Sequence, residues 1–298
     1  MTITHGTLLG GVVTTPDLAA AIADYSGTLG LDIIEQGPLA PELAASWGCP
    51  ASAGAAMAVL GPSSGAPCFI RLIEQPLPAD FRPTRTFGWA AYEFSVQDVY
   101  GWPDKLAGSG FAIVGPPKEI AGLPYFIPMQ VTGRGREMLY LNEVRENTPS
   151  SDLPKAASPV DKIFICILAT ADLPGAVAWY RRTLGLDEGG TYTIEYTMLN
   201  KAFALPDGTQ HRLTMVQAGR TPIAEVDQYP PEAAPRAHPP GTLPPGNALV
   251  TLAVDSLARP GLDWIAPPVA RGGVLYGGRR AGTVRGPAGE LLELVEVG

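Results

Sequence analysis

Clusters of basic residues are missing from this sequence. Its 298 residues hold 21 Lys and Arg against 29 Asp and Glu, a net charge of −8, and no run of Lys or Arg occurs. Nucleic acids and anionic membrane surfaces are bound through concentrated positive charge, so we expect neither as a partner. A small organic molecule is the expected ligand.

Long apolar runs and paired cysteines are lacking too. No uninterrupted apolar stretch reaches the about 18 residues of a membrane-spanning helix, and the N-terminal segment lacks the basic region of a secretion signal. The three cysteines, Cys49, Cys68 and Cys166, are odd in number and widely spaced. That pattern favours reduced thiols over a disulfide framework or a zinc cluster. We therefore expect a cytoplasmic protein.

One stretch of the chain occurs twice. Residues 15–32 read TPDLAAAIADYSGTLGLD and residues 170–187 read TADLPGAVAWYRRTLGLD, so eleven of eighteen positions are identical at an offset of 155 residues. Self-similarity at a fixed spacing indicates that one supersecondary unit was used more than once. Asp near the start of each stretch and Gly near its end are typical of the two ends of a helix.

The repeat belongs to a longer unit with the element order β-α-β-β-β. Apolar strands precede both copies, short strands follow them, and weaker copies of the same order begin near residues 89 and 249. The sequence predicts an α+β fold of four such modules. We expect them to pair into two tandem cup-shaped domains, residues 1–146 and 157–298, with a linker at 145–159.

The third module is followed by a proline-rich stretch. We expect its last three strands near residues 191–198, 201–205 and 211–217. Residues 221–246 hold so many prolines that we expect a long surface loop, of the kind that often covers a site.

The modules resemble the vicinal oxygen chelate superfamily, which includes glyoxalases, extradiol dioxygenases and bleomycin-resistance proteins. The resemblance rests on the helix pattern D-L-x-x-A-x-x-x-Y-x-x-T-L-G-L-D and on a final strand introduced by G-x-A-G-x-x-x-E-L-V-E. It implies that pairs of modules form open cups. It also implies a metal held by His on first strands and Glu on last strands.

The implied metal-ligand positions carry other residues. On first strands they are Gly10, Ala91, Ile165 and either Ala248 or Leu249; on last strands they are Arg71, Tyr140, Thr214 and Glu293. Only Glu293 is a ligand type, and the three histidines of the chain, His5, His211 and His238, lie elsewhere. A divalent metal needs at least three donors, so we expect no metal and no other cofactor.

In the expected N-terminal cup, Arg71 and Tyr140 take the place of metal ligands as catalytic candidates. A guanidinium and a phenol can together hold an oxyanion. Tyr92 and Glu93 lie on the adjacent strand, where alternation directs one of them inward; Glu93 is then a candidate base and Tyr92 a substrate contact. The competing interpretation makes Arg71 a structural ion-pair partner and Tyr140 a core residue.

In the expected C-terminal cup, Glu293 is the catalytic candidate. Thr214, His211, Tyr196 or Glu195, and, after a one-residue shift of register, Cys166 are expected substrate contacts. A carboxylate in an apolar cup has a raised pKa and moves a proton beside a carbonyl. The competing interpretation gives Glu293 a structural hydrogen bond. His238, among the loop prolines, closes over a ligand or is solvated.

These residues predict a metal-independent lyase or isomerase acting by proton transfer on a small oxygenated molecule, aromatic or polyketide-like. The first alternative is a protein that binds and sequesters a toxic compound or antibiotic. The second is a metal-dependent extradiol dioxygenase or glyoxalase. The sequence leaves open whether each cup forms within one chain or across a homodimer.

Overall fold

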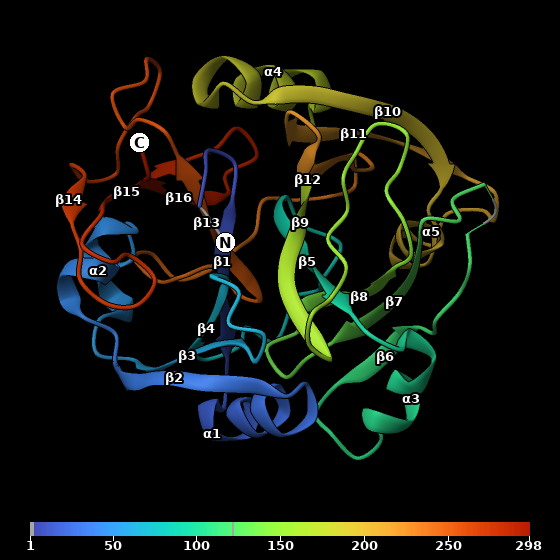
Figure 1. The fold of residues 1–298 in the computed structure, drawn as a ribbon, viewed down its shortest axis with the longest axis horizontal. Coiled ribbons are helices and arrows are strands. Elements are labelled where there is room, and N and C mark those ends of the chain that lie inside the picture. Colours follow the sequence, from blue (N-terminus) through green and yellow to red (C-terminus); the bar gives the residue numbers. More distant parts are fainter. Residues whose placement is uncertain (1–2, 121) are drawn as a thin grey trace.

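Two eight-stranded sheets make up the protein in a computed structural model that describes residues 3–120 and 122–298. Each sheet curves into an open cup, and the two lie side by side (Figure 1). The first sheet has the order β14-β15-β16-β13-β1-β4-β3-β2 and the second β10-β11-β12-β9-β5-β8-β7-β6. The concave faces of these sheets are called the first cup and the second cup.

The first sheet comprises β1 (Leu8–Thr15), β2 (Leu31–Pro38), β3 (Ala56–Pro62), β4 (Phe69–Glu74), β13 (Asn247–Val254), β14 (Val269–Ala270), β15 (Arg280–Arg285) and β16 (Leu291–Glu296). The second comprises β5 (Gly88–Val96), β6 (Ala112–Gly115), β7 (Phe126–Thr132), β8 (Met138–Val144), β9 (Val160–Thr170), β10 (Asp187–Glu195), β11 (Gln210–Ala218) and β12 (Thr221–Gln228).

The helices are short, and they connect strands. They are α1 (Leu18–Ile22), continued as one π-helical segment (Ala23–Thr28), α2 (Pro41–Ser46), α3 (Trp102–Lys105), α4 (Leu173–Leu184) and α5 (Thr197–Phe203), with 3-10 turns at Pro50–Ser52 and Val99–Gly101. In the described part of the chain, no helix is both long and apolar enough to cross a membrane.

The two strong copies of the repeat form equivalent helices. Asp17 accepts a hydrogen bond from the Ala20 amide at 2.9 Å, and Asp172 accepts one from the Gly175 amide at 3.0 Å. Each carboxylate thus caps the first turn of its helix, which contributes about 1 kcal/mol. At the other end of α4, Gly185 takes φ of 68°, where a residue with Cβ is strained. The four-module α+β fold is therefore confirmed.

The modules do not pair in the expected way. β1 of the first module pairs antiparallel with β13 of the fourth, and β5 of the second pairs antiparallel with β9 of the third. The expected pairing of consecutive modules, which placed Arg71 and Tyr140 in one cup, is wrong. The boundary expected between residues 146 and 157 lies between β8 and β9, two strands of the same sheet. Both sheets form within one chain.

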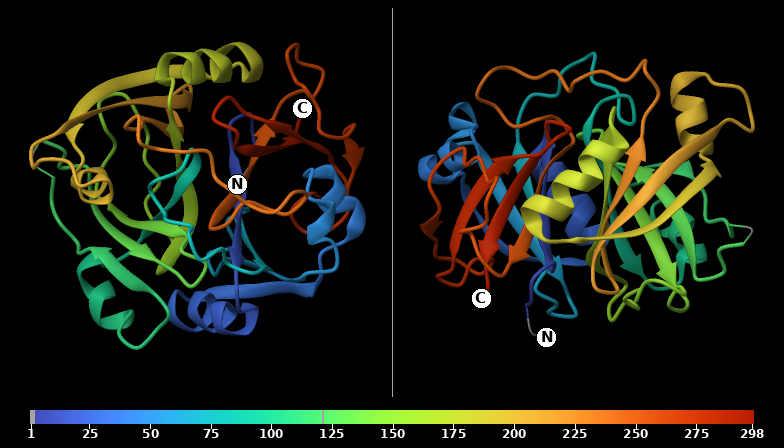
Figure 2. Two further views of the ribbon diagram at one scale, coloured as in Figure 1. Left: turned by 180° about the vertical axis from the view of Figure 1, so that it is seen from behind. Right: turned by 90° about the horizontal axis from the view of Figure 1, so that it is seen from above.

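The third module also differs from expectation. Residues 221–228 form strand β12, and residues 197–203 form helix α5 where a short strand was predicted. β12 tolerates Pro222 because this residue stands at the start of the strand, next to a register shift between Val216 and Gln217 of β11. Beyond β12 the chain runs as a proline-rich loop that crosses between the two sheets (Figure 2).

Tyr92 connects the two sheets. Its ring is fully buried, and its hydroxyl donates to the carbonyls of Val12 (2.9 Å) and Leu249 (2.8 Å) in the first sheet. A Cβ atom on Gly11 would lie 2.6 Å from the ring, so only glycine fits there. The predicted substrate contact through Tyr92 is wrong, because this side chain faces the seam between the sheets.

Candidate active site

A dense polar network fills the first cup. Arg71 on β4 forms an ion pair with Glu293 on β16 at 2.8 Å, and both side chains are at most 3% exposed. The guanidinium also donates to the hydroxyls of Tyr276 and Thr251, each at 2.7 Å. Trp47, directly after α2, donates its indole N–H to the second oxygen of Glu293 at 2.9 Å.

The hydroxyls of Tyr276 and Thr251 donate to Glu293 as well, at 2.8 Å and 2.9 Å, so its two oxygens accept four hydrogen bonds and have no free lone pair for substrate. Burial by itself raises the pKa of Glu293, but the Arg71 charge and the Trp47 and Tyr276 hydrogen bonds outweigh it and lower that pKa below its usual value. The Arg71 guanidinium also lies over the Trp47 ring, with its Cζ atom 4.6 Å from the ring centroid. The arrangement matches the structural interpretation of Arg71 and Glu293, and it offers no base with a pKa near neutrality.

The second cup gathers acidic side chains from two strands. Glu93 on β5 is opposite Tyr140 on β8, and Glu225 on β12 is opposite Ile167 on β9. Residues paired in this way project to the same face of the sheet, and Asp227 shares that face with Glu225 because side chains alternate along a strand. Three carboxyl groups thus line one concave surface.

Cationic partners of the three carboxyl groups are absent from the described part of the chain. None of them forms an ion pair with Lys or Arg among the residues that the structure describes. Glu93 accepts a hydrogen bond from the Asn142 amide. No N–H or O–H group of the described chain donates to either oxygen of Asp227, which is 1% exposed.

Burial therefore keeps these groups protonated to unusually high pH. Burial, and next the nearby Glu225, raise the pKa of Glu93 well above its ordinary range. Burial and Glu225 act in the same way on the pKa of Asp227, while burial raises the pKa of Glu225 to about 7. The carboxyl groups of Glu225 and Asp227 lie side by side, and two such acceptors bond only when one carries a proton. The cluster thus holds protons that it can exchange near neutral pH.

Helix α5 covers this cluster with aromatic and thioether side chains. The hydroxyl oxygen of Tyr140 lies 2.7 Å from that of Tyr196, which precedes α5, and 3.4 Å from the sulfur of Met198. Phe203 at the end of α5 meets Tyr229 edge to face, with ring centroids 6.1 Å apart. Burial raises the pKa of Tyr140 and of Tyr196, so both phenols stay protonated as hydrogen-bond donors.

The other sequence candidates are not part of this cluster. Thr214 is opposite Val226, on the convex face, where its hydroxyl bonds Thr191 at 2.8 Å, and Cys166 pairs with Tyr92 on that face too. The expected positions of Thr214 and Cys166 inside a cup with Glu293 are wrong. His211 is buried and bonds Asn200 at 2.7 Å, and burial lowers its pKa.

Sequence reasoning missed Glu225, Asp227 and Asn142. The prolines of residues 221–246 suggested a loop, which moved the last strand of the third module one strand too early and gave Thr214 the position that Glu225 holds. The stretch Ala224 to Asp227 does alternate apolar and acidic residues. This period of two is the signal that predicts a half-buried strand.

The metal that the resemblance implies does not fit these residues. The strand register shows which residues occupy the implied ligand position on the last strand of each module. They are Arg71, Tyr140, Glu225 and Glu293. In the described residues, no group of three His, Cys, Asp or Glu side chains is arranged to hold a metal ion.

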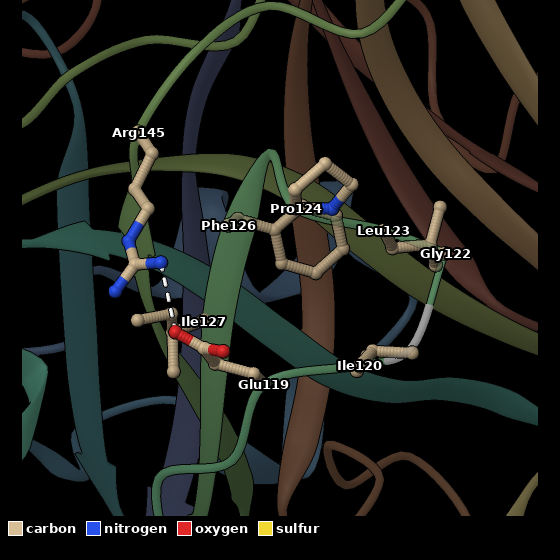
Figure 3. A pocket seen from close by; sticks show the side chains of 8 residues that line it. All are labelled: Glu119, Ile120, Gly122, Leu123, Pro124, Phe126, Ile127 and Arg145. Atoms are coloured by element: carbon tan, nitrogen blue, oxygen red, sulfur yellow. Dashed lines mark hydrogen bonds and ion pairs between the residues drawn. The ribbon is translucent and has the colours of Figure 1, made fainter.

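Two cavities lie outside the carboxyl cluster. One of about 560 Å³ lies beside the start of β7, where Arg145 and Glu119 form an ion pair at 2.9 Å, and Phe126 and Ile120 also line it (Figure 3). A second, of about 300 Å³, lies between the loop around residue 236 and the turn joining β15 to β16. Neither is lined by Glu93, Glu225 or Asp227.

Comparisons with known proteins find similarity in structure alone. No family model and no curated protein matches the sequence. The structure is similar to glyoxalase I from Zea mays, with 15% identity, a TM-score of 0.61, and coverage of 97% of this chain and 92% of that one. It is also similar to a putative dioxygenase from Bacillus subtilis subsp. subtilis str. 168, with 10% identity, a TM-score of 0.63, and coverage of 99% and 86%. At such low sequence identity, the structural similarity establishes the fold alone. The fold expected from the repeats is thereby confirmed.

Proposed function

Because the chain has the glyoxalase-like fold of the vicinal oxygen chelate superfamily, we propose that it acts on a small oxygenated molecule in its second cup. The proposed activity is that of a metal-independent lyase or isomerase, and the proposed substrate is aromatic or polyketide-like. The observation that carries the proposal is the cluster of buried Glu93 and Asp227 with half-buried Glu225, which forms no ion pair with a cation of the described residues. Burying such groups costs stability, so a cluster of this kind in a cup is typical of a functional site.

Glu225 is the proposed base. With a pKa of about 7 it is partly ionised at neutral pH, and it is less deeply buried than its two neighbours. Its carboxylate removes a proton from a carbon next to a carbonyl, and the electron pair of the C–H bond forms a C=C bond while the carbonyl oxygen becomes an oxyanion. An isomerase returns the proton to another carbon, whereas a lyase expels a leaving group.

The tyrosine pair stabilises the charge that develops. Tyr140 and Tyr196 remain protonated, and an oxyanion placed between their hydroxyls takes hydrogen bonds from them. Glu93 and Asp227 stay neutral beside the base, whose own pKa is raised by burial and lowered in part by its hydrogen bond with Asp227. Phe203 and Tyr229 supply aromatic surface for an apolar body.

Hydrogen exchange in deuterated water tests this proposal without a known product. A panel of ketones, β-keto esters and hydroxylated aromatic ketones is incubated with the protein, and deuterium uptake is followed by mass spectrometry. We expect catalysed uptake by at least one compound class and a loss of about 100-fold or more in Glu225→Gln. Thr214→Val, on the opposite face, is the matched control. Equal exchange by Glu225→Gln and wild type contradicts the assignment.

A binding protein is the second candidate. The aromatic and thioether side chains of Tyr140, Tyr196, Met198 and Phe203 support it, because they suit an apolar ligand without requiring a base. Compounds that bind with measurable affinity but are recovered unchanged and without deuterium favour this function over catalysis.

We also propose that the chain works in the cytoplasm. The free, buried thiols of Cys49, Cys68 and Cys166 support this location, because unpaired cysteines are typical of reducing compartments.

A further inference from the structure

The cavity of about 300 Å³ lies where the two sheets meet. It is lined by Phe87, Gly88, Trp89, Pro235, Arg236, His238, Pro244, Asn247, Ala248, Arg285, Ala288, Gly289 and Glu290. These residues come from the start of β5, the start of β13, the proline-rich loop and the turn between β15 and β16. The volume is at the lower end of the range for small-molecule sites.

Arg236 brings a partly buried positive charge to this cavity. Its Nε donates to the Thr86 hydroxyl at 2.9 Å, and its two terminal nitrogens donate to the carbonyls of Trp89 and Asn247, each at 2.8 Å, and of Pro245 at 3.3 Å. All of these acceptors are neutral. Burial lowers the pKa of Arg236 to about 10, so the guanidinium is still charged at neutral pH. Its contacts orient the cation without neutralising it.

Two further basic side chains line the same cavity. Arg285 is exposed, and its guanidinium donates to the Gly289 carbonyl at 3.0 Å. Burial, followed by the charges of Arg285 and Arg236, lowers the pKa of His238, which agrees with three basic groups close together. No ion pair with a carboxylate joins either arginine within residues 3–120 and 122–298.

The one acidic side chain of the lining is engaged elsewhere. Glu290 accepts hydrogen bonds from the Tyr180 hydroxyl and the Ala288 amide, each at 2.8 Å. Both of its oxygens thus have donors. On a chain with a net charge of −8, the cavity is a local site of positive charge, and low-dielectric walls concentrate its field.

We propose that this cavity binds an organic oxyanion, a carboxylate or phosphate group carried on a small apolar body. Arg236 and Arg285 hold the anionic group from two sides, because guanidinium groups suit the oxygens of both anions. Phe87, Trp89 and Ala248 contact the apolar body. The site is separate from the carboxyl cluster and does not depend on the chemistry proposed there.

Isothermal titration calorimetry with benzoate, phenyl phosphate and benzamide tests the site. We expect at least one anion to bind with Kd of about 1 mM or tighter, and neutral benzamide to bind at least about tenfold more weakly. The better of the two anions identifies the oxyanion. Arg285→Gln is expected to weaken binding at least about tenfold, since one charged contact is lost. Arg182→Gln, an exposed residue of α4, is the matched control.

Three results overturn the proposal. The first is the absence of binding by both anions at 10 mM, on the order of ten times the expected Kd. The second is equal affinity for benzoate and benzamide. The third is equal affinity in Arg285→Gln and Arg182→Gln. Because Arg285 lies at the surface, its replacement is tolerated by the fold. Glu225→Gln must bind the anion as the wild type does, which separates this test from that of the proposed function.

Discussion

The carboxyl cluster of the second cup makes the stability of the protein depend on pH in a defined direction. Glu225→Gln removes one ionisable group of the cluster and preserves the shape of the side chain. Burial raises the pKa of Glu225 from 4.5 to about 7 in the folded protein. Below pH 4.5 the carboxyl is protonated in the folded and the unfolded chain, so its ionisation costs the fold nothing. As the pH rises toward 7, the unfolded chain releases the proton and the folded chain retains it, and stability falls.

The size of this loss follows from the same pKa. The difference between 4.5 and about 7 corresponds to about 3 kcal/mol of unfolding free energy, fully lost above pH 7. Glu225→Gln avoids the loss. We therefore expect this variant to lie within about 1 kcal/mol of wild type at pH 5 and to be more stable by about 2–3 kcal/mol at pH 8.

Urea unfolding at pH 5 and pH 8 measures the difference. The variant Glu232→Gln, at an exposed position of the proline-rich loop, controls for the change of net charge and should follow the wild type at both pH values. A gain for Glu225→Gln that is the same at both pH values refutes the reasoning, because the effect then does not come from ionisation. The absence of a gain at pH 8 refutes it as well.

Two further predictions concern the first sheet and its junction with the second. Arg71→Met leaves the Glu293 charge buried without its ion-pair partner, so we expect urea unfolding to show a free energy of unfolding lower by about 3–5 kcal/mol. The double variant Arg71→Met, Glu293→Gln is expected to recover most of this loss. A loss below about 1 kcal/mol in Arg71→Met contradicts the role given to this pair. Gly11→Ala places a methyl group 2.6 Å from the Tyr92 ring, so we expect a loss of about 1–3 kcal/mol in thermal unfolding. Gly27→Ala is the control, since a Cβ there meets no atom within 4 Å, and equal losses in both variants contradict the steric argument.

The local sequence determined the modules. The repeat at an offset of 155 residues, the capping carboxylates of Asp17 and Asp172 and the period-two strands predict β-α-β-β-β units and an α+β fold. Together with the resemblance, the alternation also assigned Arg71, Tyr140 and Glu293 to last strands, and they lie in β4, β8 and β16. These features arise between residues close in the chain, so a single sequence contains them.

Only the tertiary structure decided which modules share a sheet. The first strands of all four modules are similarly apolar, and no local pattern distinguishes their partners. Their packing brings Arg71 to Glu293, 222 residues away, and separates it from Tyr140. The same packing makes a strand of residues 221–228 despite its proline and thereby creates the acidic cluster. Strand pairing over such separations depends on burial summed across the whole sheet, which no short stretch of sequence specifies.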